Sequence, residues 1–173
     1  MPLRAAVRMW GRLQLSGVTA AARQEDYGTA GELLGVAERC TQIVTVDDTD
    51  TINGGYHAAF GPSRVRMVAA ELAMSQENLD RALELSAWVS ATRRIPPMTR
   101  RRHLLDVANA HAWKGELVES IGFLTKVKAI APEWMRYQVL AREVVRTVQT
   151  GRGRRRLEGL QPLAVHVGLR PAR

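Results

Sequence analysis

The sequence predicts an all-α fold built from helical hairpin repeats. Apolar residues recur with the period of an α-helix in successive windows, most clearly over 103–114 and 116–130. Short turn segments separate these windows in pairs, which is the pattern of a helical hairpin. Similar hairpins follow one another along the chain, so we expect about three repeats and a C-terminal capping helix.

The first hairpin is predicted from a helix over about 4–23, a turn at residues 24–26 and a second helix from Tyr27 to about Thr45. The next segment, 46–62, is rich in Asp, Thr, Asn and Gly, which favour loops. Because proline is suited to the first turn of a helix, the end of this segment at Pro62 marks the start of the next helix.

Two further hairpins of the same design follow. They are helices 64–75 and 79–91 around the turn 76–78, and helices 103–114 and 116–130 around Gly115. Residues 93–97 close the first of these hairpins. Pro132 ends the other, because proline cannot donate a backbone hydrogen bond and clashes with the preceding turn.

A last helix is predicted over 133–149, where it caps the open end of the repeat stack. It carries more apolar surface than one neighbouring helix covers, so we expect self-association into a homodimer through Leu140, Val144, Val145 and Val148. From Gly151 onward the sequence shows no amphipathic period, and we expect disorder. The predicted organisation is a helical repeat domain over 1–150 and a basic tail over 151–173.

The composition is that of an ordinary globular protein. Of the 173 residues, 46% are hydrophobic and only 5% aromatic, so the core is expected to consist mainly of Ala, Leu and Val. Cys40 is the single cysteine and has no partner for a disulfide or a CxxC metal site. Arg4, Arg8 and Arg12 interrupt any signal-peptide core, and no apolar run reaches the length of a membrane span. A cytoplasmic protein is therefore expected.

The net charge of +8 is unevenly distributed. The tail 151–173 holds six arginines against the single acid Glu158, and five more arginines lie between residues 93 and 102. The rest of the chain is close to neutral. The high isoelectric point alone is therefore weak support for nucleic-acid binding.

The third hairpin resembles a tetratricopeptide repeat once the consensus proline is placed on Pro132. Gly115 then falls on the turn glycine, Ala108 on a small core position of the first helix and Leu124 on the bulky position of the second. His111 takes the place of the consensus tyrosine, which implies that it packs in the core. The resemblance implies a stack of helical hairpins with a concave binding groove.

Four segments, spread over most of residues 10–150, occur in a recognisable order: Phe60–Ser63, Asp80–Glu84, Leu104–His111 and Leu140–Arg146. Their order resembles the C-terminal sensor domain of certain helix-turn-helix transcriptional regulators of actinobacteria. In that family a DNA-binding domain precedes the sensor, and this chain is expected to be a truncated or stand-alone relative without it. The resemblance implies a ligand- or peptide-binding regulatory module that meets DNA only through a separate domain or a partner.

The tetratricopeptide register also predicts which residues line the groove. They are Arg64, Met67 and Glu71 in the second repeat, Arg102, Asn109 and Trp113 in the third, and Arg12, Leu15, Thr19 and Arg23 in the first. Arg64 and Arg102 are suited to grip a carboxylate or phosphate through charge-assisted hydrogen bonds. Trp113 offers a flat apolar contact. The expected partner is a peptide, a protein or a small acidic ligand.

Two other uses of the charged segments stay open at this point. The cluster Arg100–Arg102, together with the basic tail, is an alternative nucleic-acid contact, or else a solvated connection ahead of the helix at 103. Arg4, Arg8 and Arg12 form a stripe beside Trp10, which suits either a membrane-surface helix or, as we expect, a docked repeat helix.

No arrangement typical of an enzyme is found. The histidines are scattered, and there is no HExxH segment, nucleophile elbow or phosphate-binding glycine loop. A calcium loop counted from Asp48 fails, because Ile52 and Ala59 stand where ligands are required. Cys40 is expected to be buried rather than reactive. We therefore expect a binding protein without catalytic residues, cofactor or metal.

Overall fold

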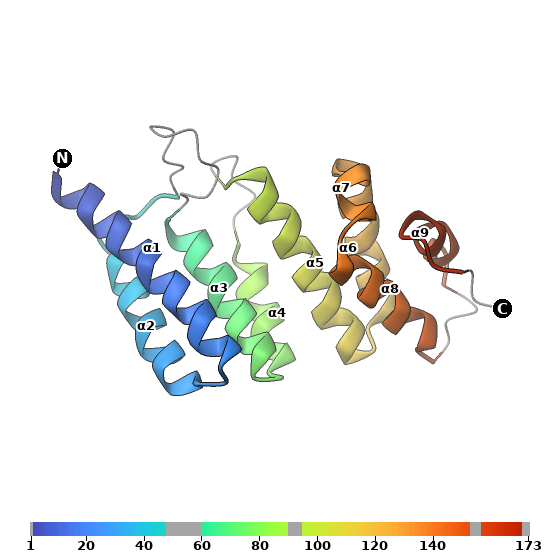
Figure 1. Ribbon diagram of the computed structural model, residues 1–173, viewed down its shortest axis with the longest axis horizontal. Helices are drawn as coiled ribbons and strands as arrows, with labels where there is room; N and C mark the ends of the chain where they lie inside the picture. Colours follow the sequence, from blue (N-terminus) through green and yellow to red (C-terminus); the bar gives the residue numbers. More distant parts are fainter. Residues whose placement is uncertain (1, 48–59, 90–94, 153–156, 171–173) are drawn as a thin grey trace. The chain divides into compact units, whose positions relative to one another are not determined.

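The structure is a computed structural model that describes residues 2–47, 60–89, 95–152 and 157–170. The all-helical prediction is confirmed, since these ranges contain helices and no strand (Figure 1). The helices are α1 (Pro2–Arg23), α2 (Tyr27–Cys40), α3 (Pro62–Ser75), α4 (Leu79–Ala87), α5 (Pro97–Lys114), α6 (Leu117–Ile130), α7 (Pro132–Arg136), α8 (Val139–Thr150) and α9 (Leu160–His166).

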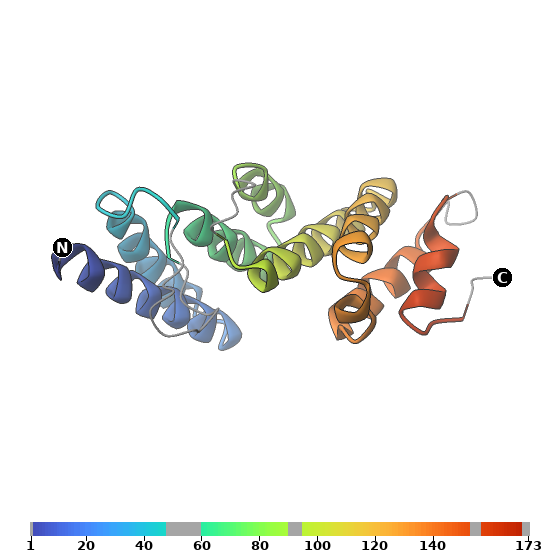
Figure 2. The same cartoon turned by 90° about the horizontal axis from the view of Figure 1, so that it is seen from above.

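The chain divides into two units, residues 1–100 and 101–173. The first unit holds the hairpins α1–α2 and α3–α4, and the second holds most of α5 together with α6 to α9. Figures 1 and 2 show α1 and α2 lying side by side along their lengths. The predicted domain over 1–150 spans the boundary between these two units.

The core of the first unit is built from small and branched apolar side chains. Its buried members come from α1, α2 and α3 and from the connection between α2 and α3. Phe60, which is fully buried, lies against α1 at Gly11, where an added Cβ would come within 2.2 Å of the ring. Asp47 accepts hydrogen bonds from the backbone N–H of Ser63 at 2.8 Å and of Arg64 at 3.4 Å. This carboxylate therefore caps α3. Residues 48–59, which form the calcium loop rejected from the sequence, lie outside the described residues.

The three predicted hairpin turns share one backbone geometry. Glu25, Glu77 and Gly115 all have positive φ, at 59°, 58° and 81°. In each turn the next residue donates its N–H to the carbonyl five positions earlier, at 3.0, 2.9 and 2.9 Å. Asp26 and Asn78 then cap the second helix by accepting from backbone N–H groups. The repetition of helical hairpins that the sequence predicted is thus present in the described chain.

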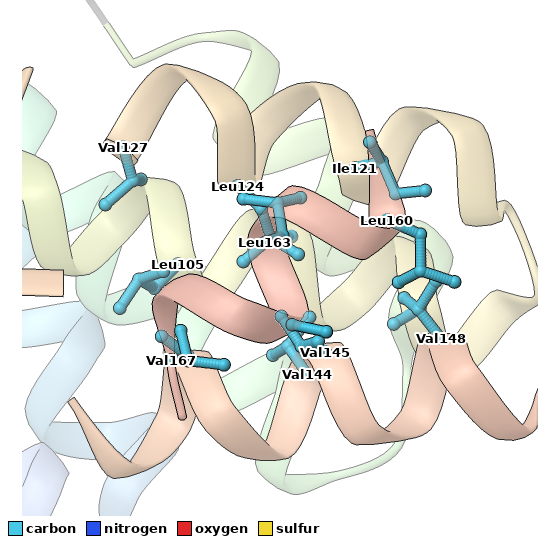
Figure 3. Close-up of a cluster of buried hydrophobic side chains, with 14 of the residues drawn as sticks. Leu105, Ile121, Leu124, Val127, Val144, Val145, Val148, Leu160, Leu163 and Val167 are labelled. Carbon is cyan, nitrogen blue, oxygen red and sulfur yellow. The ribbon is translucent and has the colours of Figure 1, made fainter. Parts of the chain in front are cut away.

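The expectation of a disordered tail over 151–173 is wrong for residues 157–170. Leu160, Leu163 and Val167 are at most 2% exposed and join the core of the second unit, which Figure 3 shows. Helix α9 packs against α6 and α8, and Arg142 of α8 donates a hydrogen bond to the carbonyl of Val167 at 3.2 Å. The missed signal is the spacing of these apolar residues, which fits one helix face.

This docking also removes the stated reason for a homodimer. Val144, Val145 and Val148 are fully buried within the chain itself. Figure 3 shows the side chains of α8 facing Leu160 and Leu163 of α9. The apolar excess of the last predicted helix is covered by a segment that was expected to be disordered.

Some predicted helix ends differ from the structure, since α2 ends at Cys40 and α4 at Ala87, earlier than expected. Two further differences have identifiable reasons. The single helix over 133–149 is divided into α7 and α8 by Tyr137 and Gln138. Met135 and Val144 are both fully buried in one cluster, although nine residues of a straight helix, about two and a half turns, would place them on opposite faces. The break allows both side chains to enter the same core. Helix α5 begins at Pro97 rather than at 103, so the arginine cluster lies inside it.

Candidate binding groove

A groove of about 550 Å³ lies in the first unit, between α1 and α3. It is lined by Met9, Arg12, Leu13, Leu15, Ser16, Thr19 and Arg64. Arg12, Leu15, Thr19 and Arg64 are among the residues that the sequence predicted for the groove face of the first two hairpins. The structure brings these four residues together around one concavity.

Helical spacing explains why α1 supplies most of the lining. Arg12, Ser16 and Thr19 follow one another at intervals of four and three, which places them along one side of the helix. The hydroxyl groups of Ser16 and Thr19 each donate to the backbone carbonyl four residues earlier, at 3.3 Å. Since these hydroxyl protons are already used, the side-chain donors that remain for a ligand belong to the two arginines.

The groove is electropositive. The lining contains no aspartate or glutamate. Helix α1 contains four arginines and no acidic residue. Arg64 has an ion pair with Glu71 at 3.6 Å, which is longer than a strong charge-assisted hydrogen bond of about 2.8 Å. Arg12 has no ion-pair partner within the described ranges. The site therefore favours an anionic group over a neutral or cationic one.

Apolar side chains flank the charged groups. Leu15 is 5% exposed and forms part of the floor, whereas Met9 is 63% and Leu13 59% exposed. Exposed side chains of this size beside a cationic cleft are typical of an interaction surface. The combination fits a ligand that carries both a carboxylate or phosphate and an apolar group.

The predicted groove residues of the second hairpin differ in whether they line the groove. Arg64 lines the groove and Glu71 pairs with it. Met67 is fully buried, so its prediction as a groove residue is wrong. Most of the circumference of α3 is covered by neighbouring helices, as is also seen at Val68 and Ala70, and little of the helix remains for ligand contact.

The predicted groove residues of the third hairpin lie on α5, within the second unit. Arg102 pairs through Nε with Asp106 at 3.0 Å, a partner that the sequence reasoning missed despite its i, i+4 spacing. Asn109 is half-buried. Trp113 is 54% exposed and so remains available for contact. A continuous groove through the second and third hairpins stays a prediction.

The arginine cluster lies within the N-terminal part of α5 and not in a connection ahead of the helix. Because α5 begins at Pro97, residues 100–102 occupy its first two turns. Asp106 balances the charge of Arg102, which lowers its value as a phosphate contact. Most of the arginines of the basic tail fall in 153–156 and 171–173, outside the described residues.

His111 takes the packed position that the sequence assigned to it. Its ring stacks on Phe123 with centroids 5.4 Å apart, and its Nδ1 lies 2.7 Å from Glu116 Oε2. Lys114 Nζ lies 2.8 Å from the other oxygen of the same carboxylate. Lys114, followed by His111, holds the pKa of Glu116 below its ordinary value. This cluster joins α5 to α6 and has a structural role.

Cys40 is buried, as expected, and burial raises the pKa of its thiol, which disfavours the reactive thiolate. No helix in the described ranges combines the length and the apolar character that a membrane crossing requires. No protein-family model, curated protein or solved structure matches the chain. The functional proposal therefore depends on the groove itself and on the sequence resemblance.

Proposed function

We propose that this protein is a tetratricopeptide-like interaction module whose α1–α3 groove binds an acidic peptide or a small acidic ligand. The observation that carries the proposal is the placement of Arg12 and Arg64, from two successive hairpins, around one groove without an acidic lining residue. No group in this groove is arranged for bond-making chemistry, so binding is the function that it supports.

The two arginines are suited to complementary parts of such a ligand. A guanidinium group presents parallel N–H donors that match the two oxygens of a carboxylate. A hydrogen bond to a charged group contributes about 1.5–3 kcal/mol in proteins, which is enough to orient a short peptide. Met9 and Leu13 offer apolar contact to a neighbouring side chain of the ligand, and their burial upon binding adds to the affinity.

A regulatory role is part of the proposal through the resemblance to sensor domains of transcriptional regulators. In that setting an occupied groove changes how the module meets its partner protein. Nucleic-acid binding by residues 100–102 is the weaker alternative, because Asp106 neutralises Arg102. A steep decrease of DNA affinity with salt, beyond that of a protein with the same net charge, would favour the alternative.

The test is a titration of the full chain with a fluorescein-labelled pentapeptide that ends in Glu-Glu-Leu with a free carboxylate, followed by anisotropy. We expect Arg12→Ala and Arg64→Ala each to weaken binding about tenfold, with a smaller effect at high salt. Arg66→Ala is the matched control, since Arg66 lies on α3 but its guanidinium donates to the carbonyl of Trp88. Equal losses in all three variants, or equal affinity for the Gln-Gln-Leu amide, would contradict the proposal.

A further inference from the structure

The first helices of the two hairpins in the first unit are directly comparable. Each ends two residues before the left-handed turn residue, Glu25 after α1 and Glu77 after α3. Alignment on these residues pairs Arg12 with Arg64, the two groove arginines. The same alignment pairs three residues of α1 with three apolar residues of α3: Leu13 with Val65, Ser16 with Val68, and Ala20 with Leu72.

The paired positions differ sharply in burial. Val65, Val68 and Leu72 are 4%, 1% and 7% exposed, and all three belong to the core that α1 and α2 share with α3. This strip of α3 is therefore the surface on which the preceding hairpin packs. Leu13 is 59% exposed, and Ser16 and Ala20 are exposed as well. On α1, the corresponding strip is uncovered.

The uncovered strip has the character of a docking surface. We define the end face of α1 as Met9, Leu13, Ser16 and Ala20, which share one side of the helix, with Trp10 exposed beside them. The opposite side already packs in the core through buried apolar residues. A surface helix normally turns charged or polar residues outward, whereas α1 is apolar on its core side and largely apolar on its end face.

Charge decides what covers this face. Arg4, Arg8, Arg12 and Arg23 are the charged residues of α1. A second copy of the chain would bring two such sets of arginines together, which electrostatic repulsion disfavours. A partner with acidic residues beside an apolar strip is complementary. The shape of the partner is indicated by α3, whose equivalent strip receives helices.

We propose that the end face of α1 docks an acidic amphipathic helix of a partner protein, in the way that α3 receives the α1–α2 hairpin. The end face of α1 extends beyond the carboxylate groove. It shares Met9, Leu13 and Ser16 with the groove lining but does not include Arg64. A flat lipid surface is the less favoured occupant, because the matched strip of α3 packs against helices.

A synthetic helical peptide tests the proposal on the full chain. The labelled probe carries leucines at intervals of three and four residues with glutamates on both flanks, and a second probe has lysines in place of the glutamates. We expect the glutamate probe to bind and the lysine probe to bind at least tenfold more weakly. Leu13→Asp and Met9→Asp should each weaken binding of the glutamate probe about tenfold or more.

Two controls separate this surface from the groove and from misfolding. Val139→Asp adds the same charge at a side chain that is 75% exposed in the second unit, and should leave binding within about twofold. Arg64→Ala should also leave the helical probe bound while it weakens the short acidic peptide, so the two proposals fail independently. Circular dichroism of each variant verifies the fold.

Three outcomes would overturn the proposal. The first is failure of the glutamate probe to bind, or binding that Leu13→Asp does not reduce. The second is Leu13-dependent binding to vesicles of phosphatidylserine and phosphatidylcholine that exceeds binding to the probe, which would assign the face to a membrane surface. The third is Leu13-dependent self-association in sedimentation, which would assign it to a second copy of the chain.

Discussion

Glu25 and Glu77 occupy the same position in two successive hairpins, and both adopt the left-handed backbone conformation, with φ of 59° and 58°. Each is followed by a residue whose side chain caps the next helix, Asp26 in one turn and Asn78 in the other. The third turn has Gly115 at this position. The turn geometry is thus maintained with glutamate where glycine is conformationally favoured.

The first prediction concerns these turns. Glu77→Gly should stabilise the protein by about 0.5–1 kcal/mol, because glycine adopts positive φ without a steric penalty. Thermal or urea unfolding measures the change. Glu84→Gly is the matched control, because Glu84 is exposed and lies away from both ends of α4. Glycine there should destabilise the protein by about 1 kcal/mol. A loss of stability in Glu77→Gly would show that the side chain has a role that the backbone geometry does not reveal.

The second prediction concerns the docking of α9. Leu163 is 2% exposed in the core of the second unit, so Leu163→Ala should cost about 2–5 kcal/mol of unfolding free energy. Val165 lies on the same helix but is 62% exposed, and Val165→Ala should change stability by less than about 0.5 kcal/mol. Urea unfolding of the two variants provides the comparison, and equal small effects would mean that α9 does not contribute to the core in solution.

The third prediction concerns the surface that α9 covers. Truncation after Thr150 should expose Val144 and Val148, which are fully buried in the intact chain. An apolar strip of this kind promotes association, so the truncated protein should self-associate at concentrations where the intact protein does not. Sedimentation velocity distinguishes the two. Identical sedimentation, together with an unchanged melting temperature, would restore the expectation of a dispensable tail.

The fourth prediction concerns acid stability. Lys114 and His111 lower the pKa of Glu116 from its ordinary value of 4.5. The Glu116 carboxylate therefore binds a proton less readily in the folded state than in the unfolded state. The resulting contribution to stability is present above about pH 4.5 and is lost as the pH falls through the folded-state pKa. Glu116→Gln should therefore flatten the decrease of stability below that pH.

The control for acid stability is Glu119→Gln in the first turn of α6, the helix that begins directly after Glu116. Glu119 has no ion pair in the part of the chain that the structure describes. Melting temperatures of both variants should be followed between neutral and acidic pH. A steeper acid dependence in Glu116→Gln than in the unmodified chain would contradict the proposed ion-pair cluster around this carboxylate.

The sequence alone determined the local elements of this protein. The apolar period identified the helices of all three hairpins, because the side chains on one face of a helix recur at a fixed interval. The polar turns at residues 24–26 and 76–78 and the glycine at 115 marked the connections correctly. Arg64 was also placed on the groove face, since the hairpin register fixes which residues share a side of the helix.

Only the tertiary structure decided which of those faces are covered. Burial depends on what packs from elsewhere in the chain, and this left Met67 inside while Leu13 remained exposed. Helix α9 is short, and a segment of that length forms mainly because α6 and α8 offer it an apolar surface. For the same reason the groove depends on the packing of α3 beside α1, which brings Arg12 and Arg64 together from positions far apart in the chain.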